Sequence, residues 1–423
     1  MEMFLELNHH IKILRDLHNM TISILVCNEE ILSNKLHELN VFLEDISISN
    51  NFSLFECFLH MLVHLSLFFD PSQKYQEIHK KHQIFLNILS ELISKHSMNK
   101  VFHQSTLFYI FKNNKHFLLF LLQKGIIDIS LIENEINYGN DKMLYLFLYN
   151  EINKVNPRFC ESFQKEIMLT KEEIMDFYKR ETEDQANDND VNIEKYLHIR
   201  KEMHSQEKLA RIIRDDNMNE FVELISKNDH IDINSKIQPS FLEDNPDINN
   251  ILGSGISLIE YSMAFGSINI FRYLWVNKAK TTQNSLEYSI IGGNLEIIHI
   301  LEEESEFKLN RKCYNLSVEY YHNEITEYFL NNNIIENPTF TEIFSLLNQT
   351  ANFELFHNYW NSTYQECMIP NKKSNQLHSY EIQMIIRNCI FNYRGITFYL
   401  FYHFFYKQSK TIDVNSLGAI YAN

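Results

Sequence analysis

Apolar side chains recur at steps of three and four residues along most of the chain, as in Phe4, Leu7, Ile11 and Leu14. This spacing places the apolar residues on one face of an α-helix. Helix-breaking residues are scarce, because the 423 residues include only 9 glycines and 6 prolines. The prolines fall between the apolar-periodic stretches, where a missing amide proton does least harm. The pattern therefore predicts an all-α fold of short helices.

One helical pattern occurs twice, as LIEYSMAFGSINIFRYL at 258–274 and, 27 positions later, as SLEYSIIGGNLEIIHIL at 285–301. The two copies share six residues at equivalent positions: Glu260 and Glu287, Tyr261 and Tyr288, Ser262 and Ser289, Gly266 and Gly293, Ile270 and Ile297, and Leu274 and Leu301. A period of about 20 to 50 residues is typical of solenoids, in which each unit buries its apolar face against its neighbours. We therefore predict an α-solenoid of stacked helix pairs.

The shared small residues have distinct expected roles. Ser262 and Ser289 are small enough to allow close contact between helices, whereas Gly266 and Gly293 can adopt the positive φ of a turn between two helices. A third, degenerate copy covers 314–330, with a serine at the small position and a tyrosine in place of the glycine. Three consecutive units are therefore expected to stack.

These segments resemble the ankyrin repeat, whose pattern reads T-P-L-H-x-A-A-x-x-G-H-x-x-I-V-x-x-L-L. The matching residues are SLIE at 257–260 for the opening tetrad, Gly266 for the turn, and IF at 270–271 with LW at 274–275 for the apolar pairs. An earlier copy, 212–234, ends in the D-I-N of the ankyrin turn. The tetrad histidine is a glutamate here, and the 27-residue spacing leaves little room for a β-hairpin. The resemblance thus implies irregular repeats with short hairpin tips.

A second resemblance extends towards the N-terminus. LFLYNEINKVNPRF at 146–159 and STLFYIFKNNKHFLLFLLQKGI at 105–126 are similar to segments that precede the repeats in a large set of ankyrin-repeat proteins of parasitic protists, of the trichomonad type. Members of that set begin with an α-helical domain of unknown function. The likeness covers most of residues 75–330 and is weakest before residue 70. It implies an irregular helical domain ahead of the repeats and no known catalytic activity.

The composition changes clearly once, at ETEDQANDNDVN (181–192), which is acidic and almost free of large aliphatic residues. We interpret 181–195 as an exposed acidic linker. The expected domains are a helical N-terminal domain of unknown function (1–180), this linker, the ankyrin-repeat region (196–330) and a C-terminal helical extension (331–423). Limited proteolysis is then expected to cut the linker first and to release two fragments that each stay helical.

Charge and cysteine usage restrict the class of protein. The net charge of -17 disfavours nucleic acids and anionic lipid surfaces as partners. The six cysteines never approach a Cys-x-x-Cys spacing, so we expect reduced packing residues. A signal peptide is not evident, and the longest apolar runs, 58–69 and 396–406, are shorter than the roughly 20 residues of a membrane helix. We expect an intracellular, cytoplasmic protein without a membrane span.

Signatures of catalysis, cofactor binding and metal binding are each incomplete. Segment 188–199 begins like a calcium loop, but isoleucines stand where that loop needs its glycine and its closing glutamate. His37 begins a zinc-protease-like pattern that lacks the second histidine, and segment 253–258 lacks the third glycine of a dinucleotide-binding turn. We therefore expect no catalytic, cofactor-binding or metal-binding residues.

The repeats and the incomplete catalytic signatures together predict a non-enzymatic module that binds another protein with the concave face of the repeat stack. The positions that point into this groove in an ankyrin unit include Ala264, Phe265, Ile291, Glu319 and Tyr320. We expect Phe265 and Tyr320 to be exposed aromatic anchors, because such residues dominate interfaces. The alternative is an enzyme whose active site, built from histidines and acids, lies in the N-terminal helical region.

The C-terminal region repeats the pattern incompletely. ITFYLFYHFFY at 396–406 is followed by KTIDVNS at 410–416, much as a D-I-N turn follows the helix before residue 230. Terminal repeats of a solenoid normally carry a polar cap. We therefore expect an uncapped aromatic helix, either because the array is cut short or because the helix docks on a partner or on a second copy of the chain.

Overall fold

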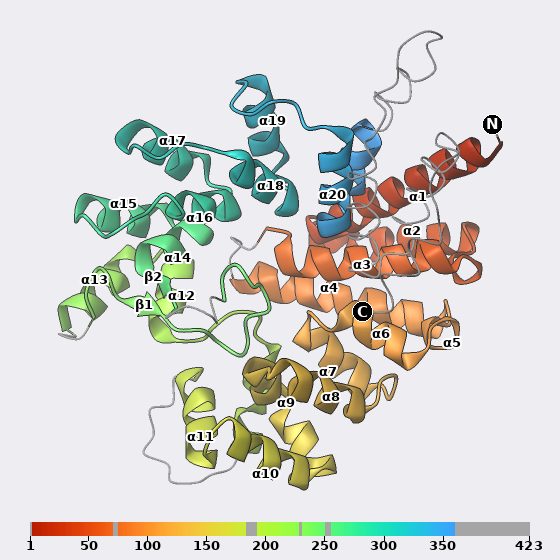
Figure 1. Cartoon of the computed structure of the whole chain (residues 1–423), viewed down its shortest axis with the longest axis horizontal. Coiled ribbons are helices and arrows are strands. Elements are labelled where there is room, and N and C mark those ends of the chain that lie inside the picture. Colours follow the sequence, from red (N-terminus) through yellow and green to blue (C-terminus); the bar gives the residue numbers. More distant parts are fainter. Residues whose placement is uncertain (1, 71–74, 183–192, 228–230, 250–254, 360–423) are drawn as a thin grey trace, which may run out of the picture. The chain divides into compact units, whose positions relative to one another are not determined.

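The computed structural model describes residues 2–70, 75–182, 193–227, 231–249 and 255–359 (Figure 1). The described chain is predominantly helical and has a single two-stranded sheet, so the expectation of an all-α class is confirmed. Within these ranges, no helix is both long and apolar enough to cross a membrane. The aromatic segment 396–406, the segment 410–416 and most of the acidic linker lie outside the described residues.

The chain divides into two compact units, one formed by Met1–Leu62 with Asn337–Asn423 and the other by Val63–Glu336. These units differ from the ranges that composition predicts. The second unit combines residues from the predicted N-terminal domain with the predicted repeats, because the two share a buried network of side chains. Residues on either side of segment 183–192 thus belong to one compact unit, and cleavage of the linker into two helical fragments stays a prediction.

The first unit contains helices from both ends of the described chain. Its elements are α1 (Glu2–Leu25), α2 (Glu29–Asp45), η1 (Ile48–Asn50), the start of α3 (Phe52–Phe68) and α20 (Phe340–Thr350). The chain beyond α20 returns to α1, where the amide of Phe353 donates to Nδ1 of His18 at 3.2 Å. Arg15 Nη1 also lies 3.2 Å from Nε2 of His357. Phe353 and His357 therefore pack against α1 within this unit.

The second unit begins with the end of α3 and continues with a series of helices, several of which are capped by side chains. They are α4 (Tyr75–Ser94), α5 (Met98–Val101), α6 (Gln104–Phe111), α7 (Lys115–Gln123), α8 (Ile129–Gly139), α9 (Lys142–Val155), α10 (Pro157–Glu166), α11 (Lys171–Arg180) and η2 (Ile193–Lys201). Asn114, Asp128, Asp141 and Asn156 accept backbone N–H groups at the starts of α7 to α10. Each cap satisfies amide groups that a helix start leaves without partners.

Four helix pairs follow, and Figure 1 draws them from green to blue. The pairs are α12 (Lys208–Arg214) with α13 (Met218–Lys227), α14 (Leu258–Ala264) with α15 (Ile268–Val276), α16 (Ser285–Gly292) with α17 (Leu295–Glu304), and α18 (Arg311–Glu319) with α19 (Asn323–Asn331). The turn residues have positive φ: Asp216 at 49°, Gly266 and Gly293 at 65°, and Tyr321 at 60°. The predicted turns at Gly266 and Gly293 are confirmed, and Tyr321 adopts the same conformation despite its side chain.

Hydrogen bonds link the turn of each pair to the pair before it. Ser267 Oγ donates to the carbonyl of Ile213 at 2.6 Å, Asn294 Nδ2 donates to the carbonyl of Gly266 at 3.1 Å, and His322 Nε2 lies 3.0 Å from the carbonyl of Ile291. In three successive pairs, the residue that follows the turn thus contacts a backbone carbonyl of the preceding pair. The small positions Ser262, Ser289 and Ser317 are fully buried, as close contact between α14, α16 and α18 requires.

A long connection separates the second pair from the first. β1 (Lys236–Ile237) pairs antiparallel with β2 (Ile256–Ser257) across this connection. Residues 238–249, here called the β1–β2 loop, fold back onto the protein with Phe241 and Leu242 fully buried. Asn249 Nδ2 ties the loop together by donating to the carbonyls of Ser240 and Glu243 at 2.8 and 2.9 Å.

The helices α14 and α16 approach each other closely at Gly292, so we expect a larger side chain there to be destabilising. A Cβ there would lie 2.0 Å from the carbonyl oxygen of Met263, so Gly292→Ala must push α14 and α16 apart. We expect a loss of about 1–3 kcal/mol of unfolding free energy, measured by urea denaturation. Gly139→Ala is the control, because nothing lies within 4 Å of an added Cβ there. Equal midpoints for the two variants would show that the helices are not this close.

Candidate functional site

The residues predicted to bind a partner lie mostly inside the second unit. Ala264, Phe265, Ile291 and Tyr320 are 0%, 3%, 2% and 1% exposed, and the side chain of Glu319 is 27% exposed. The prediction that Phe265 and Tyr320 are exposed aromatic anchors is therefore wrong. The inner face of the helix pairs carries these residues, as the repeat pattern indicates, but other parts of the same chain cover it.

Phe265 is covered by the segment that precedes the repeats. Its ring centroid lies 4.6 Å from that of Tyr261 and 5.1 Å from that of His204, which meets it edge-on. The guanidinium of Arg214 lies 5.7 Å from the same ring. Phe265 is thus a packing residue, and its replacement by alanine would remove core contacts before it tested any partner.

Tyr320 is covered by the β1–β2 loop and by the end of α3. Its hydroxyl donates to Oδ1 of Asn245 at 3.0 Å and to Oδ2 of Asp247 at 2.9 Å, and its ring meets Phe68 edge-on at 5.4 Å. Burial and the neighbouring Asp247 carboxylate raise the pKa of Tyr320 well above its usual value. Burial and nearby Glu319 likewise raise the pKa of Asp247. This contact joins the last helix pair to the loop.

A buried ion pair attaches the same loop to α7. Lys115 Nζ lies 2.7 Å from Oδ1 of Asp244 and donates to the carbonyl of Glu243 at 2.8 Å. The side chains of Lys115 and Asp244 are 10% and 3% exposed. Charges that leave water are stabilised only where they are paired in good geometry. The pair therefore fixes the position of the loop against the N-terminal helices of this unit.

Two further side chains extend this network to η2. The ring of His116 lies between the carbonyls of Leu242 and Arg200, at 3.1 and 3.2 Å. Burial lowers the pKa of His116, an effect that Asp244 opposes. Arg200 donates to both carboxylate oxygens of Glu151, at 2.6 and 2.9 Å, which links η2 to α9. Residues on both sides of segment 183–192 are thus bonded to one another.

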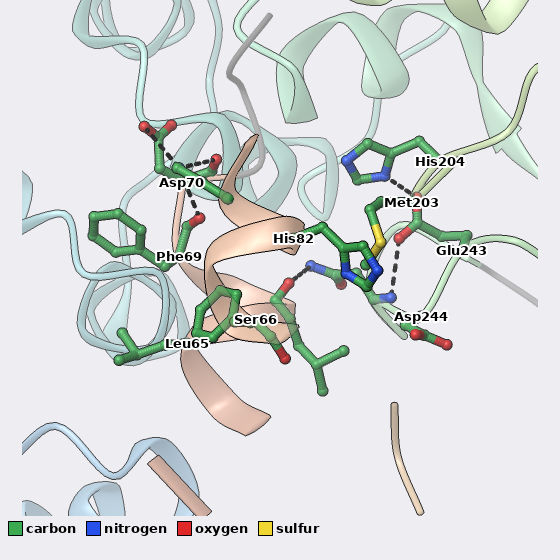
Figure 2. A pocket seen from close by; sticks show the side chains of 13 residues that line it. Leu65, Ser66, Phe69, Asp70, His82, Met203, His204, Glu243 and Asp244 are labelled. Atoms are coloured by element: carbon green, nitrogen blue, oxygen red, sulfur yellow. Dashed lines mark hydrogen bonds and ion pairs between the residues drawn. The ribbon is translucent and has the colours of Figure 1, made fainter. Parts of the chain in front are cut away.

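A small polar hollow lies beside this network (Figure 2). Its volume is about 50 Å³, and its lining includes His82, Met203, His204, Glu243 and Asp244. Figure 2 shows His204 and Glu243 pointing toward one another, with 2.5 Å between His204 Nδ1 and Glu243 Oε2. Such a volume accommodates a few water molecules. In the described ranges, no three His, Cys, Asp or Glu side chains are grouped so that they could hold a metal ion.

Sequence reasoning missed Lys115, His116 and Asp244. The available signal was a Lys-His pair directly before the apolar run FLLFLL of α7, where a solvent-facing pair would be unusual. The segment that contains Asp244, LEDNPDIN, has the composition of an exposed turn. Its burial depends on contacts with residues more than 100 positions away.

A comparison with known families gives a partial match. The family model described as Domain of unknown function (DUF3447) matches residues 276–359, which run from the end of α15 to beyond α20. This domain is found in ankyrin-repeat proteins. No curated protein and no solved structure matches the chain. The match supports a helical, repeat-like protein of unestablished function.

The buried ion pair predicts a large effect of removing one partner. Lys115→Met leaves the Asp244 carboxylate buried without its cation, so we expect a loss of about 3–5 kcal/mol of unfolding free energy. Urea denaturation measures this loss. Lys165→Met, at an exposed position on α10, is the control and should cost less than about 0.5 kcal/mol. The double variant Lys115→Met/Asp244→Asn should recover part of the loss. A Lys115→Met variant as stable as the control would contradict the assignment of Lys115 and Asp244 as a buried ion pair.

His82 predicts a pH dependence of stability. Burial, His116 and His79 lower the pKa of His82 to about 3, from an unfolded value of about 6.5. Below pH ~6.5 the unfolded chain takes up a proton that the folded chain does not, so stability falls as the pH falls. Between about pH 7.5 and 5.5 we expect a loss of about 1 kcal/mol from this group.

The measurement compares urea midpoints at the two pH values. His82→Phe should reduce the pH-dependent loss, whereas replacement of His37, which is exposed on α2, should leave it unchanged. Identical pH dependence in wild type and His82→Phe would show that folding does not lower the pKa of His82.

Proposed function

We propose that the protein is a non-enzymatic protein-interaction module and that residues 196–330 form an ankyrin-type solenoid. The observation that carries this proposal is the series of hydrogen bonds that Ser267, Asn294 and His322, each directly after a turn residue, make to backbone carbonyls of the preceding helix pair. Units that contact only their neighbours in this way form extended surfaces rather than enclosed sites. The match of 276–359 to a domain found in ankyrin-repeat proteins supports the same interpretation.

The partner-binding surface in this proposal is the outside of the stack. The inner face is covered by His204, by the β1–β2 loop and by the end of α3. The loops between pairs and the outer helices remain exposed, including Val276 at the end of α15, which is 73% exposed. An intracellular, cytoplasmic location belongs to the same proposal and is supported by the charge and cysteine usage of the chain.

The enzyme alternative receives less support from the geometry. The hollow that brings histidines and acids together has about 50 Å³, whereas small-molecule sites usually have about 300–1,000 Å³. His204 Nδ1 and Glu243 Oε2 are hydrogen-bonded to each other, and Asp244 pairs with Lys115. These contacts hold the β1–β2 loop in place and form part of the packing.

A display experiment tests the proposal. The purified full chain is panned against a library of random 12-residue peptides, and the affinities of enriched peptides are measured by fluorescence anisotropy. We expect peptides whose binding is weakened at least about tenfold by substitutions at exposed repeat positions, such as Val276→Asp and Lys280→Glu. Matched substitutions at exposed positions on α10, Arg158→Glu and Lys165→Glu, should change binding less than about twofold. The proposal would be overturned if no peptides were enriched, or if only the α10 substitutions weakened the binding of the enriched peptides.

A further inference from the structure

We propose that the loops along one edge of the helix pairs form a basic docking surface for an acidic segment of a partner protein. This surface, here called the loop edge, consists of residues 231–237, 277–284, 305–312 and 332–336. The inference rests on the proposed interaction function and adds the chemistry of the partner. It does not use the inner face.

Hydrogen bonds between consecutive loops show that the loop edge is one continuous surface. The amide of Lys280 donates to Oδ1 of Asn234 at 2.9 Å. Gln283 Nε2 donates to the carbonyl of Lys308 at 3.0 Å. Arg311 Nη2 donates to the carbonyl of Glu336 at 2.9 Å. Residues that are 25 to 46 positions apart in sequence therefore link consecutive loops.

The loop edge is positive in a chain that is strongly negative. Its four loops contain six basic residues (Lys236, Lys278, Lys280, Lys308, Arg311 and Lys312) and three acidic residues (Asp232, Glu306 and Glu336). The difference of +3 contrasts with -17 for the whole chain. Lys278, Lys280 and Lys308 are exposed, and none of the three forms an ion pair within the described residues. Their charges are therefore available to a partner.

Lys278 lies directly after α15, where its φ of 62° ends the helix. The amide of Lys278 donates to the carbonyl of Trp275, and the amide of Ala279 donates to that of Leu274, both at 3.0 Å. This turn fixes the backbone of an exposed lysine at the loop edge. The neighbouring Val276, 73% exposed, adds an apolar contact beside the lysine.

The charge pattern favours an acidic polypeptide over a nucleic acid. A nucleic acid presents one phosphate at every nucleotide and would meet the acidic residues within the loop edge and the negative field of the whole chain. A short acidic peptide carries fewer charges and can place them opposite individual lysines. Complementary surface charge of this kind raises the association rate and the specificity of a complex.

The test uses the full-length chain and two labelled 12-residue peptides, one of alternating Glu and Gly and one of alternating Gln and Gly. Fluorescence anisotropy at low ionic strength measures both affinities. The charge-reversed variant is Lys278→Glu/Lys280→Glu/Lys308→Glu. The control, Lys100→Glu/Lys165→Glu/Lys171→Glu, changes the net charge equally at exposed positions outside the repeats. Circular dichroism and urea midpoints confirm that both variants fold.

We expect the Glu peptide to bind the wild type at least about tenfold more tightly than the Gln peptide. The loop-edge variant should lose about tenfold in affinity or more, the control less than about threefold, and added salt should weaken binding. Equal losses in both variants, no preference for the Glu peptide, or tighter binding of a single-stranded 12-nucleotide RNA would overturn the inference. If peptides from the display experiment bind the repeats but carry no excess of acidic residues, this inference is wrong. The proposed interaction function is not contradicted by that result.

Discussion

The second unit depends on the buried pair of Lys115 and Asp244. This ion pair fixes the β1–β2 loop, which then offers Asn245 and Asp247 to Tyr320 on the last helix pair. One loop thus bonds to helices that precede it and to helices that follow it. Because a buried charge without its partner is costly, the loop has little freedom to leave this position. The helix pairs therefore have a fixed connection to α7 in addition to their contacts with one another.

The inner face of the pairs has a different role from the one that a repeat pattern alone suggests. In a free-standing solenoid the inner face is open, and its aromatic residues are available to partners. Here Phe265 packs on His204, and Tyr320 packs on Phe68 and the loop. These residues contribute to the stability of the unit, because large buried side chains stabilise by several kcal/mol each. Any partner must then use the surface that this packing leaves exposed.

Local features of the structure could be predicted from the sequence, whereas its long-range contacts could not. The 27-residue repeat predicted the helix pairs, the buried serines and the positive φ of Gly266 and Gly293. These properties depend on residues close in sequence and on neighbouring repeats. The burial of Phe265 and Tyr320 depends on segments far away in the chain. The return of Phe353 to His18 is also long-range, with 335 positions between them.

Polar composition was a misleading guide to exposure in the β1–β2 loop. Asn245 and Asn249 are buried, yet each amide is satisfied by a carbonyl, at 3.0 Å from Leu67 and at 2.8 Å from Ser240. A loop whose polar groups have hydrogen-bond partners can be buried without a large loss of stability, since the cost of burial falls on groups that lack partners. Composition records how polar a segment is but not whether its polar groups meet partners. Lys278, Lys280 and Lys308 of the loop edge are the opposite case, because they are exposed and form no ion pair within the described residues, and their charges can act on another molecule.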